Sequence, residues 1–108
     1  MNIPKIILQF FAEIVGTFVF ISLIFIITSK ESKAHIIAIP IGLALAISIL
    51  IFGDFTGGHF NPAISFAIFI KEPKIFTGVM LAVYCLAQAI GGFSALEFYN
   101  YIKSKNII

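Results

Sequence analysis

Several polar side chains interrupt the apolar stretches of this sequence, and four of them are candidates for a functional role: Glu13, His59, Asn61 and Gln88. Catalysis would require a nucleophile with a base beside it, and the sequence holds no such pair. It also lacks the glycine-rich loop ending in Gly-Lys-Ser/Thr that binds phosphates. His59 has no second His, Cys or carboxylate at ligand spacing, so we predict no metal site. The sequence therefore indicates that the protein is not an enzyme and uses no cofactor.

The composition indicates that these polar residues lie in a membrane. Of 108 residues, 60% are hydrophobic and 11% are charged, and the mean hydropathy is +1.10. A soluble domain usually carries about 25% charged residues. The net charge of +2 comes from scattered Lys residues and is too small to indicate a nucleic-acid partner. The single cysteine, Cys85, excludes an internal disulfide. We expect an integral, multi-pass protein whose surroundings are the lipid bilayer.

Three apolar runs are long enough to cross a bilayer, at about residues 6–28, 36–52 and 75–98. As a helix, the first run would be roughly 34 Å long, against roughly 30 Å of hydrocarbon. A cleaved signal peptide is the competing interpretation of this run. Its apolar core would be shorter and would not tolerate Glu13 at its centre. The sequence therefore predicts three transmembrane helices.

Residues 53–70 are predicted to enter the membrane and leave it on the same side. Asn61 stands at a helix N-cap position, and Pro62 at the first helical position, where its missing N–H costs nothing. The helix from Pro62 to Ile70 would be roughly 14 Å long, about half the hydrocarbon thickness. We expect residues 53–59 to be extended and to lead the chain to the bilayer centre. The predicted fold class is all-α integral membrane, with three transmembrane helices and one re-entrant half-helix.

Each predicted span carries small residues at four-residue spacing, which places them on one helix face and allows close helix packing in lipid. They are Ala12 and Gly16; Ala38, Gly42 and Ala46; and Ala87, Gly91 and Ala95. We therefore expect all three helices to pack as a tight bundle.

Two polar side chains within the spans need partners. A carboxylate inside the membrane, such as Glu13, requires a hydrogen-bonding partner or a water-filled cavity. The alternative is a protonated or snorkelling Glu13 that faces an interface. For Gln88, an ordinary hydrogen bond between helices competes with a direct role in function.

The polar segment and its surroundings resemble the aquaporin and glycerol-facilitator family (major intrinsic proteins). The resemblance covers residues 57–67 around Asn61-Pro62-Ala63, residues 12–18 and 42–44, and the Tyr84, Gln88 and Gly91 pattern. Members of the family contain two inverted repeats of three spans each, and one is present here. The resemblance therefore implies that residues 1–108 form a single aquaporin-like half-repeat, half of an aquaporin-like fold.

The resemblance also implies residue roles. In the family, two half-helices meet at their N-termini in mid-membrane, and an Asn from each donates into a single-file pore. The corresponding path residues would be Gly57, Gly58, His59, Asn61, Pro62, Ala63, Ile64 and Ile41. Glu13 would support the path by accepting hydrogen bonds from buried backbone N–H groups, and Gln88 would be a packing partner.

Ile41 and Ile64 make the implied filter unusual. The family carries an Arg directly after the second Asn-Pro-Ala, whereas Ile64 follows the single copy here, and all seven basic residues are Lys. Ile41 occupies the filter position of the second span, where water-selective members often carry an aromatic residue. A filter from this chain alone would be less polar and less cationic, so water and glycerol both stay open as solutes.

Three interpretations of function remain open. The chain forms a channel for water or small neutral solutes as a homo-oligomer of oppositely oriented copies. Alternatively, it is a truncated or split aquaporin that needs a complementary half-channel, or a non-conducting membrane interaction protein. Its Lys residues fall three on one side and four on the other, so they indicate no preferred orientation.

Overall fold

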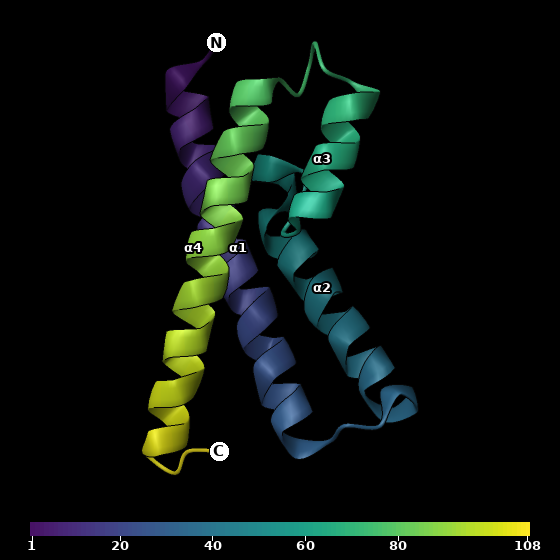
Figure 1. Ribbon diagram of the computed structural model, residues 1–108, viewed down its shortest axis with the longest axis vertical. Coiled ribbons are helices and arrows are strands. Elements are labelled where there is room, and N and C mark those ends of the chain that lie inside the picture. The colour runs from purple at the N-terminus through teal and green to yellow at the C-terminus, as the bar shows by residue number, and fades with distance from the viewer.

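The computed structural model describes residues 1–108 as four helices and no strands (Figure 1). The helices are α1 (Ile3–Lys30), α2 (Ala34–Thr56), α3 (Pro62–Lys71) and α4 (Gly78–Ser104). By length and composition, α1, α2 and α4 can cross a membrane, and α3 is a shorter apolar helix. The predicted fold class of three transmembrane helices and one half-helix is confirmed.

Side-chain caps fix where three of the helices begin. The Oδ1 of Asn2 accepts a hydrogen bond from Lys5 N at 3.0 Å, and Pro4 lies in the first turn of α1. Thr77 caps α4 through its Oγ1, 3.4 Å from Met80 N. Asn61 caps α3 in the same way, followed by Pro62. These residues satisfy backbone N–H groups that have no partner within a helix.

The second helix is longer than the sequence predicted. We expected residues 53–59 to be extended, but residues 53–56 belong to α2, which ends at Thr56. Gly57 closes the helix in a left-handed conformation and donates its N–H to Gly53 O at 2.7 Å. A helix satisfies its own backbone hydrogen bonds where lipid cannot, which explains the extra turn. The connection to α3 is therefore only residues 57–61.

The helices form a slab of 45 × 28 × 19 Å rather than a closed bundle. α1 packs against both α2 and α4, and α3 packs against α4. After α2 the chain doubles back, and α3 occupies only the half of the molecule nearer the N-terminus (Figure 1). The start of α1 and the end of α4 lie at opposite ends of the slab (Figure 1).

Small residues bring α1 and α4 together. A Cβ added to Gly91 would lie 2.5 Å from Ile14 O and 2.9 Å from Thr17 Cβ, so the two backbones meet there. Ala12, Ala87 and Ala95 are also buried, whereas Gly16 packs against the ring of Phe60. Only small side chains such as those of glycine and alanine allow the backbones of α1 and α4 to approach this closely.

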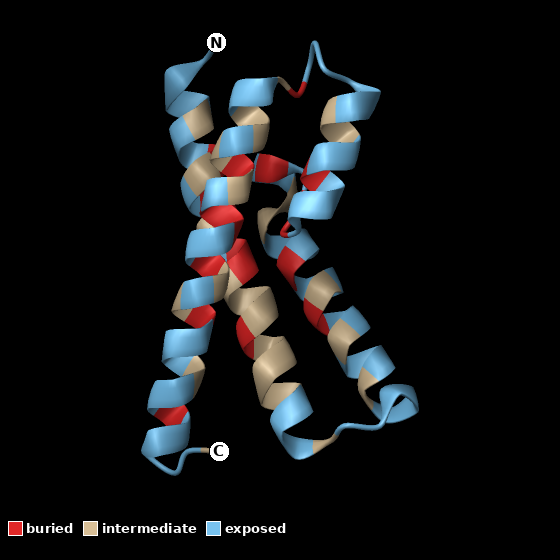
Figure 2. Ribbon diagram, viewed as in Figure 1, coloured by how far each residue is buried: buried red, intermediate tan, exposed pale blue.

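The small residues of α2 do not pack in the same way, so the expectation of three tightly packed helices is wrong for this helix. Ala38, Gly42 and Ala46 are exposed, and a Cβ on Gly42 would meet no atom within 4 Å. The buried residues of α2 are Ala44, Ser48 and Thr56, which lie on another face. Figure 2 shows buried residues gathered along α4, the middle of α1 and the connection, with most of α2 open.

Candidate functional site

The connection between α2 and α3 has an unusual backbone. Gly57 and Gly58 have φ values of +88° and +68°, and Phe60 has φ of +51°. The left-handed region is easy for glycine but costly for a bulky side chain, so surrounding contacts must hold Phe60 there. The ring of Phe60 is 3% exposed and lies where a Cβ on Gly16 would stand.

Glu13 ties this connection to two helices. Its carboxylate is fully buried, and Oε1 accepts hydrogen bonds from Phe60 N at 2.6 Å and from Gln88 Nε2 at 3.0 Å. α1, α4 and the connection are therefore joined at one oxygen atom. Because Glu13 is fully buried, it does not snorkel to an interface, which removes that alternative.

Ser65 links His59 to Gln88, and sequence reasoning gave it no role. Its hydroxyl oxygen accepts a hydrogen bond from Gln88 Nε2 at 2.9 Å and lies 2.9 Å from His59 Nδ1. Ser65 is fully buried although it stands in an otherwise apolar half-helix. This single hydroxyl group, one helical turn after Asn61, is the feature of the sequence that could have indicated a role for Ser65.

The ring of His59 faces the interior of the chain. It is 5% exposed and packs against Phe76 and Tyr84, with ring centroids 5.0 and 4.8 Å away. No group of three or more His, Cys, Asp or Glu side chains could hold a metal ion anywhere in residues 1–108. These contacts hold the His59 ring in place as a packed aromatic side chain.

The end of α2 is also fastened to α4. The hydroxyl of Tyr84 donates to Thr56 O at 2.8 Å, and Thr56 Oγ1 accepts from Gly58 N at 3.0 Å. Sequence reasoning noted Tyr84 only as part of a pattern and gave Thr56 no contact. Together with Glu13, these bonds hold both ends of the connection.

The N-terminus of α3 is the exposed part of the site. Asn61 Oδ1 accepts a hydrogen bond from Ala63 N at 2.8 Å, which directs this oxygen toward the helix. The amide group Nδ2 then points away from the helix and keeps both of its donors. Asn61, Pro62, Ala63 and Ile64 are all exposed. The structure thus presents a hydrogen-bond donor at the positive end of a helix macrodipole.

Ile41 lies apart from this group. It is half-buried in the first half of α2, which starts at the end of the molecule opposite to the N-terminus (Figure 1). α3 extends from Asn61 toward the N-terminal end (Figure 1). Ile41 and the body of α3 therefore occupy different halves of the molecule.

Comparison with known proteins gives one family. A family model described as major intrinsic protein matches residues 2–107. No solved structure matches the chain.

Three relatives illustrate the similarity. Aquaglyceroporin-2 of Rhizophagus irregularis is 34% identical over 103 residues, which cover 87% of this chain and 32% of the relative. Glycerol uptake facilitator protein-like 6 of Lactiplantibacillus plantarum is 36% identical over 91 residues, which cover 81% of this chain and 40% of the relative. Aquaporin Z of Photorhabdus laumondii is 28% identical over 103 residues, which cover 89% of this chain and 44% of the relative. The chain spans less than half the length of each of these relatives.

Proposed function

Because this chain belongs to the major intrinsic protein family, we propose that it is one half of a channel for water or small neutral solutes such as glycerol. The relatives include proteins named for water and for glycerol, which supports this solute class. The three membrane-length helices make the chain an integral, multi-pass membrane protein.

The proposal rests on the exposed hydrogen-bond donor at the N-terminus of α3. Asn61 is exposed, and its capping bond to Ala63 N leaves the Nδ2 group free to donate to a passing oxygen. The helix adds roughly half a positive charge at the same point, which favours an oxygen lone pair and opposes cations. A solute with hydroxyl groups, or water, fits this combination.

The remaining path residues have supporting roles in the proposal. Pro62 and Ala63 form the tip, and the backbone carbonyls of Gly57 and Gly58, whose φ values are positive, would line the connection. His59 contributes its carbonyl, while its buried ring anchors the connection against Phe76 and Tyr84.

Glu13 and Gln88 lie behind the path in this proposal. Both are buried, and they share a hydrogen bond at 3.0 Å that reaches the connection through Phe60 N. If two half-repeats pair, Ile41 of one copy and Ile64 of the other would make the narrow part apolar, which favours small neutral solutes over ions.

We further propose that a pore forms when two half-repeats pair, with residues 1–108 acting as one such unit. Two open surfaces support this: the exposed small residues of α2, and α3, which packs only against α4. The second unit is either another copy in the opposite orientation or a separate chain that carries the complementary repeat. Three Lys residues at one end and four at the other allow either orientation.

Osmotic permeability of liposomes containing the purified chain tests the proposal. We expect faster shrinkage than in empty vesicles. The Asn61→Asp variant should reduce this gain in rate at least about tenfold, because Asp has no amide group to donate to the solute and adds a negative charge at the constriction. The matched control is Asn100→Asp, the same change at an exposed position of α4, which should conduct normally.

Rates equal to those of empty vesicles would contradict the homo-oligomeric channel. Adding a chain that carries an Asn-Pro-Ala-Arg repeat would then distinguish the remaining cases. Recovery of permeability indicates a split channel, whereas binding without permeability indicates a non-conducting interaction protein.

A further inference from the structure

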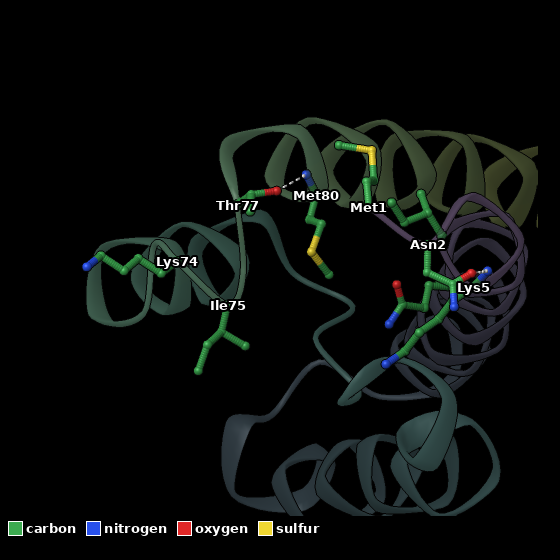
Figure 3. Close-up of a pocket in the computed structure, with 9 residues that line it drawn as sticks. Met1, Asn2, Lys5, Lys74, Ile75, Thr77 and Met80 are labelled. Atoms are coloured by element: carbon green, nitrogen blue, oxygen red, sulfur yellow. Dashed lines mark hydrogen bonds between the residues drawn. The ribbon is translucent and has the colours of Figure 1, made fainter.

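A cleft of about 490 Å³ lies at the N-terminal end of the molecule, between the start of α1 and the start of α4 (Figure 3). Its lining comes from the chain before and within the first turns of these two helices, and includes Asn2, Lys5, Gln9, Lys74, Thr77 and Met80. None of the proposed path residues lines it. A volume of this size is in the range of small-molecule sites, about 300–1,000 Å³.

The cleft is electropositive. Two helices begin at it, capped by Asn2 and Thr77, and neither has an acidic residue in its first turn. The ammonium group of Lys5 reaches toward the cleft, whereas the side chain of Lys74 points away from Lys5 and lies at the rim (Figure 3). The nearby Glu72 is exposed and is not part of the lining. Helix N-termini and Lys together favour an anion.

Gln9 supplies a second, independent observation. It lines the cleft but is only 7% exposed, and its Oε1 is buried without a hydrogen-bond partner. An unpaired buried acceptor costs about 1–3 kcal/mol, so a group that donates to it would be favoured. No donor of the chain, the Lys5 ammonium included, lies within hydrogen-bond distance of this oxygen.

We propose that the cleft binds a phosphate ester that also carries a hydroxyl group, the chemistry of glycerol phosphate. The phosphate lies at Lys5 and the two helix N-termini, and the hydroxyl donates to Gln9 Oε1. Four apolar lining residues would contact the carbon atoms of the ligand.

The position of the cleft suits two sources of this chemistry. α1 has 28 residues and is roughly 42 Å long, so its ends extend past roughly 30 Å of hydrocarbon into the headgroup region. The ester is therefore either the headgroup of an anionic glycerophospholipid or a soluble phosphate ester from the adjoining solution.

The test measures the thermal unfolding temperature of the full chain in a neutral detergent. Glycerol phosphate and short-chain phosphatidylglycerol are titrated in separate arms, with glycerol and short-chain phosphatidylcholine as their controls. We expect a saturable rise in at least one of the two phosphate arms and none in the controls, since a ligand that binds the folded state stabilises it. A rise with glycerol phosphate identifies a soluble ester, and a rise with the lipid alone identifies a headgroup.

Two variants locate the site. Lys5→Gln should raise the half-saturating concentration about tenfold, the effect of losing one charge-assisted hydrogen bond. Lys103→Gln removes the same charge at the exposed opposite end and should leave it unchanged. Gln9→Leu should weaken binding of glycerol phosphate but not of inorganic phosphate.

The proposal is overturned if neither phosphate ligand raises the unfolding temperature, or if Lys5→Gln and Lys103→Gln weaken binding equally. A Gln9→Leu chain that binds glycerol phosphate as tightly as the unmodified chain would overturn the hydroxyl contact. Because no arm measures transport, failure here is distinct from failure of the channel proposal.

Discussion

At the scale of single residues, one carboxylate oxygen joins segments that are remote in sequence. Glu13 Oε1 accepts from Phe60, 47 residues away, and from Gln88, 75 residues away. Both donors are buried, so no water replaces the carboxylate if it is removed. The hydrogen bond to Glu13 is one of the contacts that hold Phe60 in its unfavourable backbone conformation.

Glu13→Gln should therefore lower the free energy of unfolding by about 1–2 kcal/mol, because a neutral amide oxygen accepts the two hydrogen bonds more weakly than a carboxylate does. Unfolding in mixed detergent micelles measures it. Glu97→Gln, at an exposed position of α4, is the control and should change stability by less than about 0.5 kcal/mol. Equal stability of the two variants would contradict the role of Glu13.

Only part of the site was predictable at this scale. The Asn61-Pro62 start of α3 is a local signal, because the N-cap and the first helical position depend on neighbouring residues alone. The bonds of Ser65 depend on Gln88, 23 residues away, and no spacing in the sequence specifies that contact. The resemblance to the family implied that Glu13 accepts hydrogen bonds from buried backbone N–H groups, but it named neither Phe60 nor Gln88 as a donor.

At the scale of helices, contact between α1 and α4 depends on where glycine lies. The neighbours Gly91 and Gly92 differ completely in their surroundings. A Cβ on Gly91 would meet Ile14 O at 2.5 Å, whereas a Cβ on Gly92 would meet nothing within 4 Å. The pair therefore tests close packing with the same substitution on the same helix.

Gly91→Ala should destabilise the chain by about 1–3 kcal/mol, because the added methyl group forces the two backbones apart. Gly92→Ala should be neutral or slightly stabilising, since alanine is the better helix former. Unfolding in mixed micelles compares them. If Gly91→Ala is as stable as Gly92→Ala, helix propensity rather than close packing governs this face.

The length of α2 shows where helix prediction failed. Gly53 and Asp54 are poor helix formers, so the sequence suggested an extended entry into the membrane. In the structure both residues are helical, and the left-handed Gly57 ends the helix instead. The need to satisfy backbone hydrogen bonds in lipid outweighs the low helix propensity of these two residues. The sequence around them offered no other indication of where the helix ends.

At the scale of the whole molecule, the spans and the half-helix were predictable because length and hydropathy determine them. The open face of α2 was not, since spacing identifies a face without identifying what it packs against. Ala38, Gly42 and Ala46 remain exposed in a single chain. This face is available to a second half-repeat.

Gly42→Leu should leave the stability of the single chain unchanged, because a Cβ there meets nothing. It should nevertheless prevent pairing, and permeability and oligomer size in micelles should fall together. Ala89→Leu, on an exposed face of α4, is the matched control. An unchanged oligomer in the Gly42 variant would place the pairing surface elsewhere.

The positions of residues 1 and 108 determine how two linked copies would be oriented. α1 starts at one end of the slab and α4 finishes at the other, after three crossings (Figure 1). If residues 1–108 were joined in tandem to a second copy, that copy would start on the far side of the membrane and run in the reverse direction. A short peptide link would then hold the two copies in the inverted arrangement that the channel proposal requires, with no added crossing.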